Sequence, residues 1–170
     1  MTHRAEIPGS ENQRLSTPSK SEPLKTAGQL TVATDKPAYP PYFVDDDPAN
    51  GKGFESAVAY AIADHLGLAQ DQVTWVVVPF DSSYAPGDKS FDFDVNQISI
   101  TDARKKAVDF STPYYTAPQA IIVKKGSPLE GKTTLADFAG ATIGVQVGTT
   151  SLDAVTMTWM AEQAGAPELK

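Results

Sequence analysis

The sequence lacks cysteine altogether and has only two histidines, His3 and His65, among its 170 residues. The missing thiols exclude a disulfide framework, thiol catalysis and a cysteine-based metal site. Basic residues are in the minority, because 14 Lys and Arg stand against 21 Asp and Glu, which leaves a net charge of −7. This acidic balance provides no electrostatic attraction to nucleic acid or to an anionic membrane. The composition therefore favours an ordinary soluble protein.

Long apolar runs are missing as well. No segment approaches the roughly 20 apolar residues that a transmembrane helix needs. The N-terminus has neither the charged start nor the apolar core of a signal peptide, so we expect any export signal to lie outside this chain. Residues 1–28 are rich in Ser, Thr, Pro, Glu and Lys and show no apolar period. They predict a disordered N-terminal segment.

From residue 30 onward, the apolar pattern predicts an α/β fold with a parallel sheet at its core. The expected strands are Leu30–Thr34, Val73–Val78 and Phe91–Ile98. Between the first two strands, apolar residues recur at helical spacing from Phe54 to Leu66, and Gly67 supplies a stop signal. A strand, a helix and a second strand in this order form the crossover unit of a parallel sheet.

Another structural unit is expected in the last part of the chain. Thr134 and Asp137 form a capping box for a short helix, Ala141–Val145 has the composition of a strand, and Gly148–Ser151 opens a helix that should end at Gly165. The letters GTTS are most often only a helix cap, and they lack the lysine of a phosphate-binding loop. Alternatively, the free N–H groups at this helix start form an anion-binding site.

The segment Asn96–Arg104, NQISITDAR, carries the strongest functional signal. Thr101 is a good helix cap and Asp102 suits the positive end of a helix dipole, so Arg104 falls on the first turn. This turn follows a predicted strand, and open α/β sheets bind ligands outside the carboxyl ends of their strands. A guanidinium placed there binds carboxylates through two parallel hydrogen bonds. The alternative is a solvated basic run, which composition alone favours.

Six segments resemble, in the same order, the amino-acid-binding proteins of bacterial ABC importers, in the polar amino-acid branch of extracellular solute-binding protein family 3. Any one segment is weak evidence, but six in register are specific. They are LTVATDKPAYPPYFV (30–44), GKGFESAVAYAIADHLGL (51–68), FDFDVNQISITDAR (91–104), VDFSTPYY (108–115), IIVKKGS (121–127) and LADFAGATIGVQVGTTS (135–151).

The resemblance implies a periplasmic-binding-protein-like fold of type II, in which two α/β lobes are built on parallel-core sheets. Lobe 1 is expected at residues 29–118 and the hinge or crossover strand at 119–127, which includes the apolar run Ala120–Val123. Residues 128–170 are expected to form an incomplete second lobe that lacks its carboxylate for the ligand ammonium group. We therefore expect this chain to bind ligand weakly or not at all.

The resemblance also implies a binding site for a free amino acid. In it, Arg104 holds the α-carboxylate of the ligand as a bidentate partner. Ser99 and Thr101 add hydroxyl and backbone donors beside it. The remaining expected contacts are Gly148, Thr149 and Thr150 from the facing lobe, and Tyr39, Tyr42, Asp35, Asn96 and Gln97 from lobe 1.

Several of these residues also have purely structural interpretations. Tyr39 matches the aromatic position of the family better than Tyr42, although this chain has one extra residue after Asp35, and one of the two tyrosines is expected in the core or at the rim. Asp35 precedes a proline-rich turn and is equally well a turn former. Asn96 and Gln97 depart from the resembled family, several members of which have small hydroxyl residues at these positions. Their amides offer both donors and acceptors, which suggests a polar ligand side chain.

Two acidic groups have solvent-exposed interpretations. The run Asp45–Asp47 resembles a metal-binding sequence, but its setting fits a solvated turn. Asp92 and Asp94 are expected to be solvated charges at the end of a strand. We therefore expect neither a metal site nor a cofactor.

The implied function is that of the extracytoplasmic substrate-binding component of an ABC transporter, in the periplasm or anchored by lipid at the cell surface. It would bind a polar amino acid by hinge closure and deliver it to the permease as a monomer, with no enzymatic activity. Two alternatives remain. One is an enzyme on the same scaffold, such as a cyclohexadienyl or prephenate-type dehydratase, and the other is a ligand-binding sensor domain of a kinase or channel.

Overall fold

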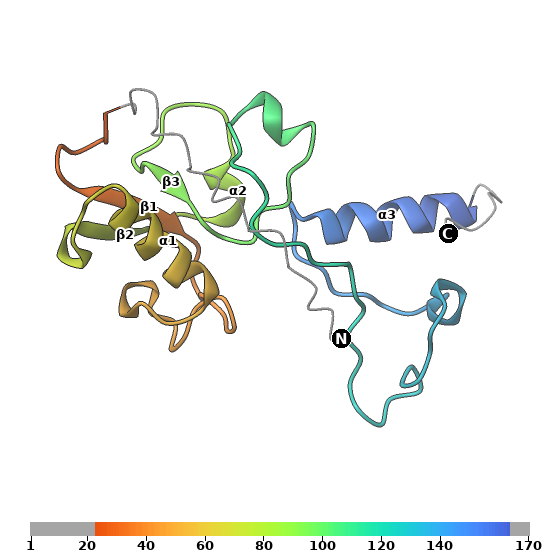
Figure 1. Cartoon of the computed structure of the whole chain (residues 1–170). Coiled ribbons are helices and arrows are strands. Elements are labelled where there is room, and N and C mark those ends of the chain that lie inside the picture. The colour runs from red at the N-terminus through yellow and green to blue at the C-terminus, as the bar shows by residue number, and fades with distance from the viewer. Residues whose placement is uncertain (1–22, 164–170) are drawn as a thin grey trace, which may run out of the picture.

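The structure is a computed structural model that describes residues 23–163 (Figure 1). A small sheet with its covering helix lies at one side of the molecule, and a longer C-terminal helix extends away from it. The predicted disordered segment 1–28 falls mostly outside the described residues, and the predicted helix stop at Gly165 falls outside them entirely.

A three-stranded parallel sheet confirms the predicted parallel core. Its strands are β1 (Leu30–Thr34), β2 (Val73–Val77) and β3 (Phe93–Asp94), in the spatial order β2-β1-β3. β1 pairs with β2 along its whole length and with β3 over two residues. As the central strand, β1 is buried at every position. The carboxyl ends of all three strands therefore meet at one edge of the sheet.

Helix α1 (Phe54–His65) crosses from β1 to β2 and ends two residues before Gly67, as predicted. Its start depends on Gly53, whose φ is 95°, because a Cβ atom there would lie 2.4 Å from the carbonyl oxygen of Tyr42. The core between this helix and the sheet is small. It consists of Leu30, Val32, Ala38, Phe43, Ala59, Ala63 and Val95.

The structure corrects three of the predicted strands. Phe91–Ile98 contributes only the two residues of β3, because the chain turns away at Gln97, whose φ is 47°. Ala120–Val123 and Ala141–Val145 are extended loops, since neither forms a bridge with another segment in the described part of the chain. An extended segment becomes a strand only where a second backbone supplies its hydrogen bonds.

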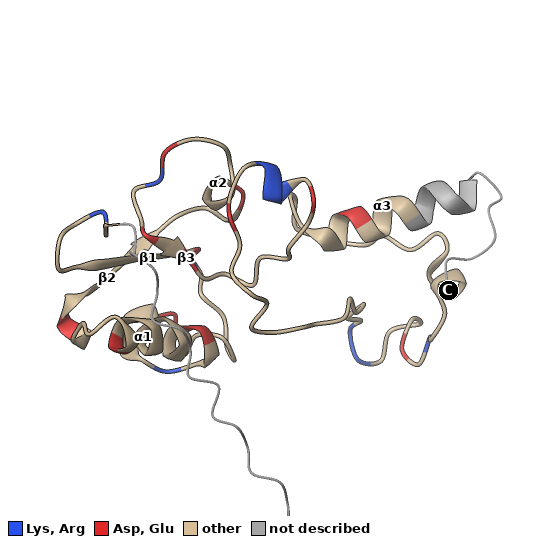
Figure 2. Cartoon of the chain, turned by 45° about the horizontal axis from the view of Figure 1, so that its top comes forward, with Lys and Arg blue, Asp and Glu red and all other residues tan. Residues whose placement is uncertain are grey.

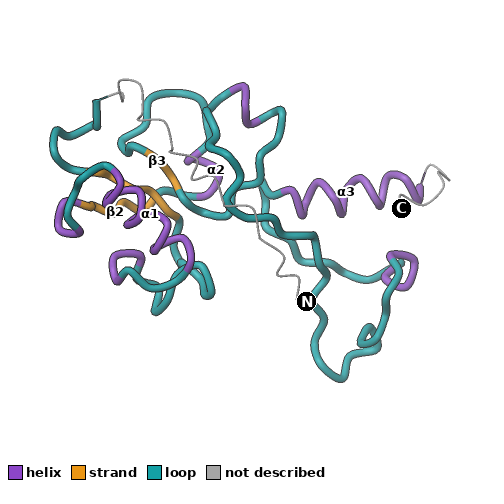
Figure 3. Tube along the Cα trace, in the orientation of Figure 1, coloured by secondary structure: helices purple, strands orange, loops and turns teal. Residues whose placement is uncertain are grey.

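Loops and short helical turns make up most of the chain after β3 (Figure 3). Helix α2 (Phe80–Ser83) follows β2, and the short helix predicted at Arg104 is a single 3-10 turn, Arg104–Lys106. A second 3-10 turn, Leu135–Phe138, has the predicted capping box, and α3 (Thr150–Gln163) confirms the helix predicted to open at GTTS. None of the described helices is both long and apolar enough to cross a membrane.

Basic and acidic residues are spread along the described chain in short stretches (Figure 2). The basic turn Arg104–Lys106 lies between α2 and the start of α3. The acidic run Asp45–Asp47 forms a turn, as expected, in which Asp46 accepts a hydrogen bond from the N–H of Ala38 at 2.7 Å and Asp47 accepts one from Ala49 at 3.0 Å. No cluster of three His, Asp or Glu residues suited to a metal ion occurs in residues 23–163.

Candidate functional site

A pocket of about 290 Å³ lies beyond the carboxyl ends of β1 and β3, beside the start of α3. This is the edge at which open α/β sheets bind ligands. Its wall combines segments that are far apart in the sequence. Eight of the eleven residues expected at the site line it, namely Asp35, Tyr39, Asn96, Gln97, Ser99, Arg104, Thr149 and Thr150.

Arg104 is almost completely buried in the wall of this pocket, with 9% of its surface exposed. Its Nη1 donates to the carbonyl oxygen of Ser99 at 2.7 Å, and its Nη2 donates to the carbonyl oxygen of Gly148 at 2.7 Å. Thr101 does not line the pocket. Its hydroxyl instead accepts a hydrogen bond from the backbone N–H of Arg104 at 3.2 Å, which fixes the turn that carries the guanidinium.

Two aromatic rings surround the guanidinium of Arg104. The ring of Tyr84 lies 4.3 Å from its central carbon and the ring of Phe80 lies 5.6 Å from it. The rings contact each other edge to face at 5.6 Å. Such contacts stabilise a desolvated cation by roughly 2 kcal/mol. Neither ring was among the expected site residues, although two aromatics four residues apart shortly after the predicted strand Val73–Val78 were a usable signal.

The start of α3 forms the opposite wall. The hydroxyl of Thr149 donates to the carbonyl oxygen of Gln146 at 2.7 Å and accepts from the N–H of Leu152 at 3.2 Å, so Thr149 is the helix cap. Thr150 lies beside Ser99 of the first wall, with 3.2 Å between the two hydroxyl oxygens. The helix start therefore serves as a cap and as a pocket wall at once.

Gln97 and Asn96 differ in what they offer to a ligand. Gln97 donates from its backbone N–H to the carboxylate of Glu55 at 2.8 Å, and its side-chain amide donates to the same carboxylate. Glu55 is fully buried on α1 and also accepts from the hydroxyl of Tyr114 at 2.6 Å. The Nδ2 of Asn96, by contrast, is buried without a hydrogen-bond partner among the described residues. Of these two residues, only Asn96 therefore has a side-chain amide nitrogen that is left entirely for a ligand.

Asp35 and the two tyrosines also occupy different positions. Asp35 accepts from the N–H groups of Lys36 at 2.7 Å and of Phe80 at 3.3 Å, so it shapes a turn while lining the pocket. Tyr39 lines the pocket with 66% of its surface exposed. Tyr42 lies outside the pocket lining, because its ring packs edge to face on Tyr115 at 6.0 Å. Gly148 contributes its carbonyl group to Arg104 and not to the lining.

Asp92 and Asp94 are not the solvated charges that were expected. The carboxylate of Asp92 accepts hydrogen bonds from the backbone N–H groups of Lys25 and Thr31, each at 2.7 Å. Both carboxyl oxygens of Asp94 are buried. Burial raises the pKa of Asp94 to about 7, and the nearby carboxylates of Glu55 and Asp35 contribute to the increase. The sequence reasoning missed this because the alternation of residues 91–98 does not continue as a strand.

Comparison with known proteins identifies one family. Residues 30–162 match the model of the bacterial extracellular solute-binding proteins, family 3. The chain is 37% identical over 128 residues to the L-cystine-binding protein TcyJ of Escherichia coli (strain K12). The aligned segment covers 74% of this chain and 46% of the relative. It is 35% identical over 127 residues to the arginine-binding periplasmic protein of Mannheimia haemolytica, and this aligned segment covers 74% of this chain and 48% of the relative.

A third relative is the L-arginine-binding protein of Pseudomonas aeruginosa, which is 31% identical over 129 residues, or 71% of this chain and 48% of the relative. The chain thus spans about half the length of these curated relatives. All three are named as binding proteins and none as an enzyme. No solved structure matches the chain.

Proposed function

The chain belongs to the bacterial extracellular solute-binding proteins of family 3, and on that basis we propose that it forms part of a receptor for a free polar amino acid. The receptor acts outside the cytoplasm, as the substrate-binding component of an ABC transporter, and passes its ligand to the permease subunits. It works as a monomer and needs no cofactor.

The buried guanidinium of Arg104 in the wall of a small pocket is the observation that carries this proposal. Two of its N–H groups donate to carbonyl oxygens. Because a guanidinium has five N–H groups, three are left for a ligand carboxylate in the described part of the chain. Charge-assisted hydrogen bonds contribute about 1.5 to 3 kcal/mol each, so two or three account for much of the roughly 8 kcal/mol of micromolar binding.

The other pocket residues suit the remaining groups of an amino acid. Asp35 offers a carboxylate for a cationic group, and the exposed ring of Tyr39 offers an apolar face beside it. The buried Nδ2 of Asn96 suits an acceptor on the ligand, because a buried donor without a partner costs about 1 to 3 kcal/mol. The hydroxyls of Ser99 and Thr150 add short polar contacts from both walls.

The size of the pocket and the relatives together suggest the class of ligand. A volume of about 290 Å³ lies just below the range for ligand pockets, roughly 300 to 1,000 Å³, which fits a single small molecule. The relatives are named for binding cystine and arginine. Both compounds carry a further charged group besides one carboxylate and one ammonium. We therefore infer an amino acid with a polar or charged side chain.

Hinge closure explains how such a ligand is retained. Lobe 1 (29–118) contributes Arg104 and the segment 119–127 acts as the hinge, while the partial second lobe (128–170) contributes the start of α3. A ligand that contacts both walls binds the closed form better than the open form, and it therefore shifts the population toward closure.

Saturation-transfer NMR on the 170-residue chain tests the proposal, because this method detects weak binding. A panel of L-amino acids is offered at millimolar concentration, and we expect signal for one amino acid or for a small group with polar side chains. Arg104→Ala should lower the affinity by about a hundredfold or more, since it removes at least two charge-assisted hydrogen bonds.

Lys105→Ala is the matched control. Lys105 carries the same charge on the neighbouring position, and its only described ion pair is an exposed one with Asp102 at 3.4 Å. This variant should bind like the parent chain. The proposal is wrong if the Arg104 and Lys105 variants bind an amino acid equally well.

A further inference from the structure

Two side chains from lobe 1 donate to a single carbonyl oxygen of the facing wall. The oxygen of Gly148 accepts from the Nη2 of Arg104 at 2.7 Å and from the hydroxyl of Tyr84 at 2.8 Å. Both hydrogen bonds join residues that are far apart in the sequence, since Gly148 follows Tyr84 by 64 residues and Arg104 by 44.

Tyr84 also determines the orientation of the guanidinium. Its ring lies on the guanidinium at 4.3 Å, while the edge contact with Phe80 holds that ring in place. The guanidinium is consequently confined between an aromatic face and two carbonyl groups. Each terminal nitrogen has two N–H groups, so one N–H on each remains for a ligand.

The conformation of Gly148 makes this contact possible. Its φ is 77°, and a Cβ atom at this position would approach the hydroxyl oxygen of Tyr84 to 2.9 Å. A residue with a side chain would therefore be strained in its backbone and would collide with the group that donates to its carbonyl. Glycine removes both obstacles.

We propose that Tyr84 and Arg104 form a latch on the carbonyl of Gly148, which holds the two walls of the pocket together. Tyr84 is a positioning residue in this latch, since it orients Arg104 and shares its acceptor. The benefit to ligand binding rests on the proposed function, whereas the latch itself does not need a ligand.

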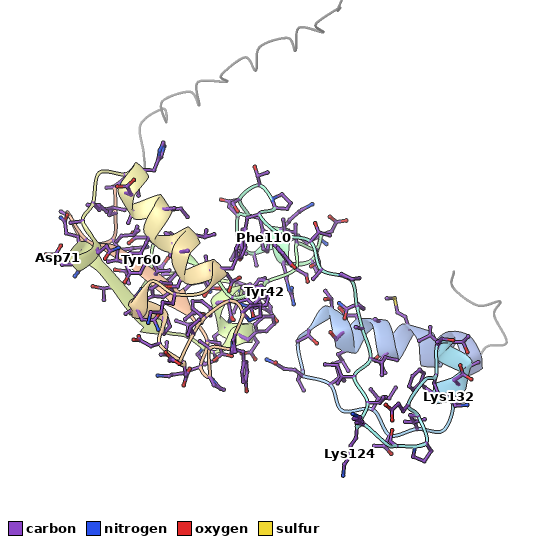
Figure 4. All side chains as sticks on the ribbon, turned by 60° about the horizontal axis from the view of Figure 1, so that its bottom comes forward. Tyr42, Tyr60, Asp71, Phe110, Lys124 and Lys132 are labelled. Atoms are coloured by element: carbon purple, nitrogen blue, oxygen red, sulfur yellow. The ribbon has the colours of Figure 1, made fainter. Side chains whose placement is uncertain are left out.

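Distance measurements in the ligand-free chain test the latch. Because the chain has no native cysteine, spin labels can be attached at Asp71→Cys and Lys124→Cys alone. Both positions are exposed and lie at opposite ends of the molecule (Figure 4). Pulsed electron paramagnetic resonance should give one narrow distance distribution for the parent chain. Tyr84→Phe keeps the ring and removes the hydroxyl donor, so it should broaden or shift that distribution.

Tyr60→Phe is the matched control. The hydroxyl of Tyr60 donates to the carbonyl oxygen of Ala49 at 2.8 Å, so this variant loses a similar hydrogen bond inside lobe 1. It should leave the distance distribution unchanged. If Tyr84→Phe and Tyr60→Phe give the same distribution as the parent, the latch does not exist.

Binding measurements on the same variants separate this inference from the proposed function. For an amino acid that the parent chain binds, Tyr84→Phe should weaken the affinity by roughly threefold to tenfold, the effect of one neutral hydrogen bond, and Tyr60→Phe should not. Unchanged affinity in Tyr84→Phe would contradict its positioning role. If Arg104→Ala binds an amino acid as well as the parent does and Tyr84→Phe still broadens the distances, the proposed function fails and the latch stands.

Discussion

Replacing Asp94 by asparagine should make the stability of the fold less dependent on pH and higher in neutral solution. Burial raises the pKa of this carboxyl from 3.8 to about 7 in the folded chain, with further contributions from Glu55 and Asp35, while the Ser83 hydroxyl and Lys89 act in the opposite direction. The folded chain therefore binds a proton that the unfolded chain has released. Between these two pKa values, the free energy of unfolding must fall as the pH rises.

The expected size follows from the same shift. At 1.36 kcal/mol per pKa unit, an increase from 3.8 to about 7 corresponds to at most about 4 kcal/mol of stability lost by the time the pH exceeds 7. Asp94→Asn has a similar shape and no charge. This variant should escape most of the loss. Its free energy of unfolding should therefore exceed that of the parent chain only slightly near pH 4 and most above pH 7.

Urea unfolding across this pH range measures the effect, with circular dichroism as the signal. Asp88→Asn serves as the control, because Asp88 is exposed and this substitution removes the same formal charge as Asp94→Asn. Its free energy of unfolding should follow that of the parent at every pH. If Asp94→Asn shows the same pH dependence as the parent, the carboxyl of Asp94 is not protonated in the folded chain and the reasoning fails.

Three further outcomes are expected. Glu55→Gln removes a charge that raises the pKa of Asp94 in the folded chain, so the loss of stability in the same urea series should end at a lower pH and be smaller in total. Gly148→Ala should lower the thermal unfolding midpoint, with a cost of about 1 kcal/mol or more from the positive φ and the contact with Tyr84, and Tyr84→Phe should relieve part of it. Phe43→Ala should destabilise the sheet by about 3 to 5 kcal/mol in urea unfolding, because Phe43 is 1% exposed in the core.

The elements that the sequence predicted well are those whose signals are local. The buried strand Leu30–Thr34, helix α1 with its glycine stop and the capped start of α3 each depend on neighbouring residues in the chain. The predicted strands at 119–127 and 141–145 were wrong for the opposite reason. Their composition suits a strand, but a strand also needs a partner backbone, which composition does not reveal.

The candidate site shows the same division. Thr101 and Arg104 could be placed from the capping pattern, and the resemblance indicated that the start of α3 lies opposite them. The role of Tyr84 was not predictable in this way, because its contacts with Arg104 and Gly148 join segments that only the folded chain brings together. The burial of Asp94 was missed since it depends on where β3 stops pairing.

The latch and the ligand site share one guanidinium, and this couples closure to recognition. Arg104 holds the wall at Gly148 and, under the proposed function, the carboxylate of the ligand. When only a fraction of molecules is competent to bind, the apparent affinity is the intrinsic affinity multiplied by that fraction. A latch that contributes about 1.4 kcal/mol raises the ratio of joined to separated walls tenfold, so it can improve the apparent affinity by up to about tenfold. By linkage, a carboxylate ligand that orders the same guanidinium must strengthen the latch to the same extent.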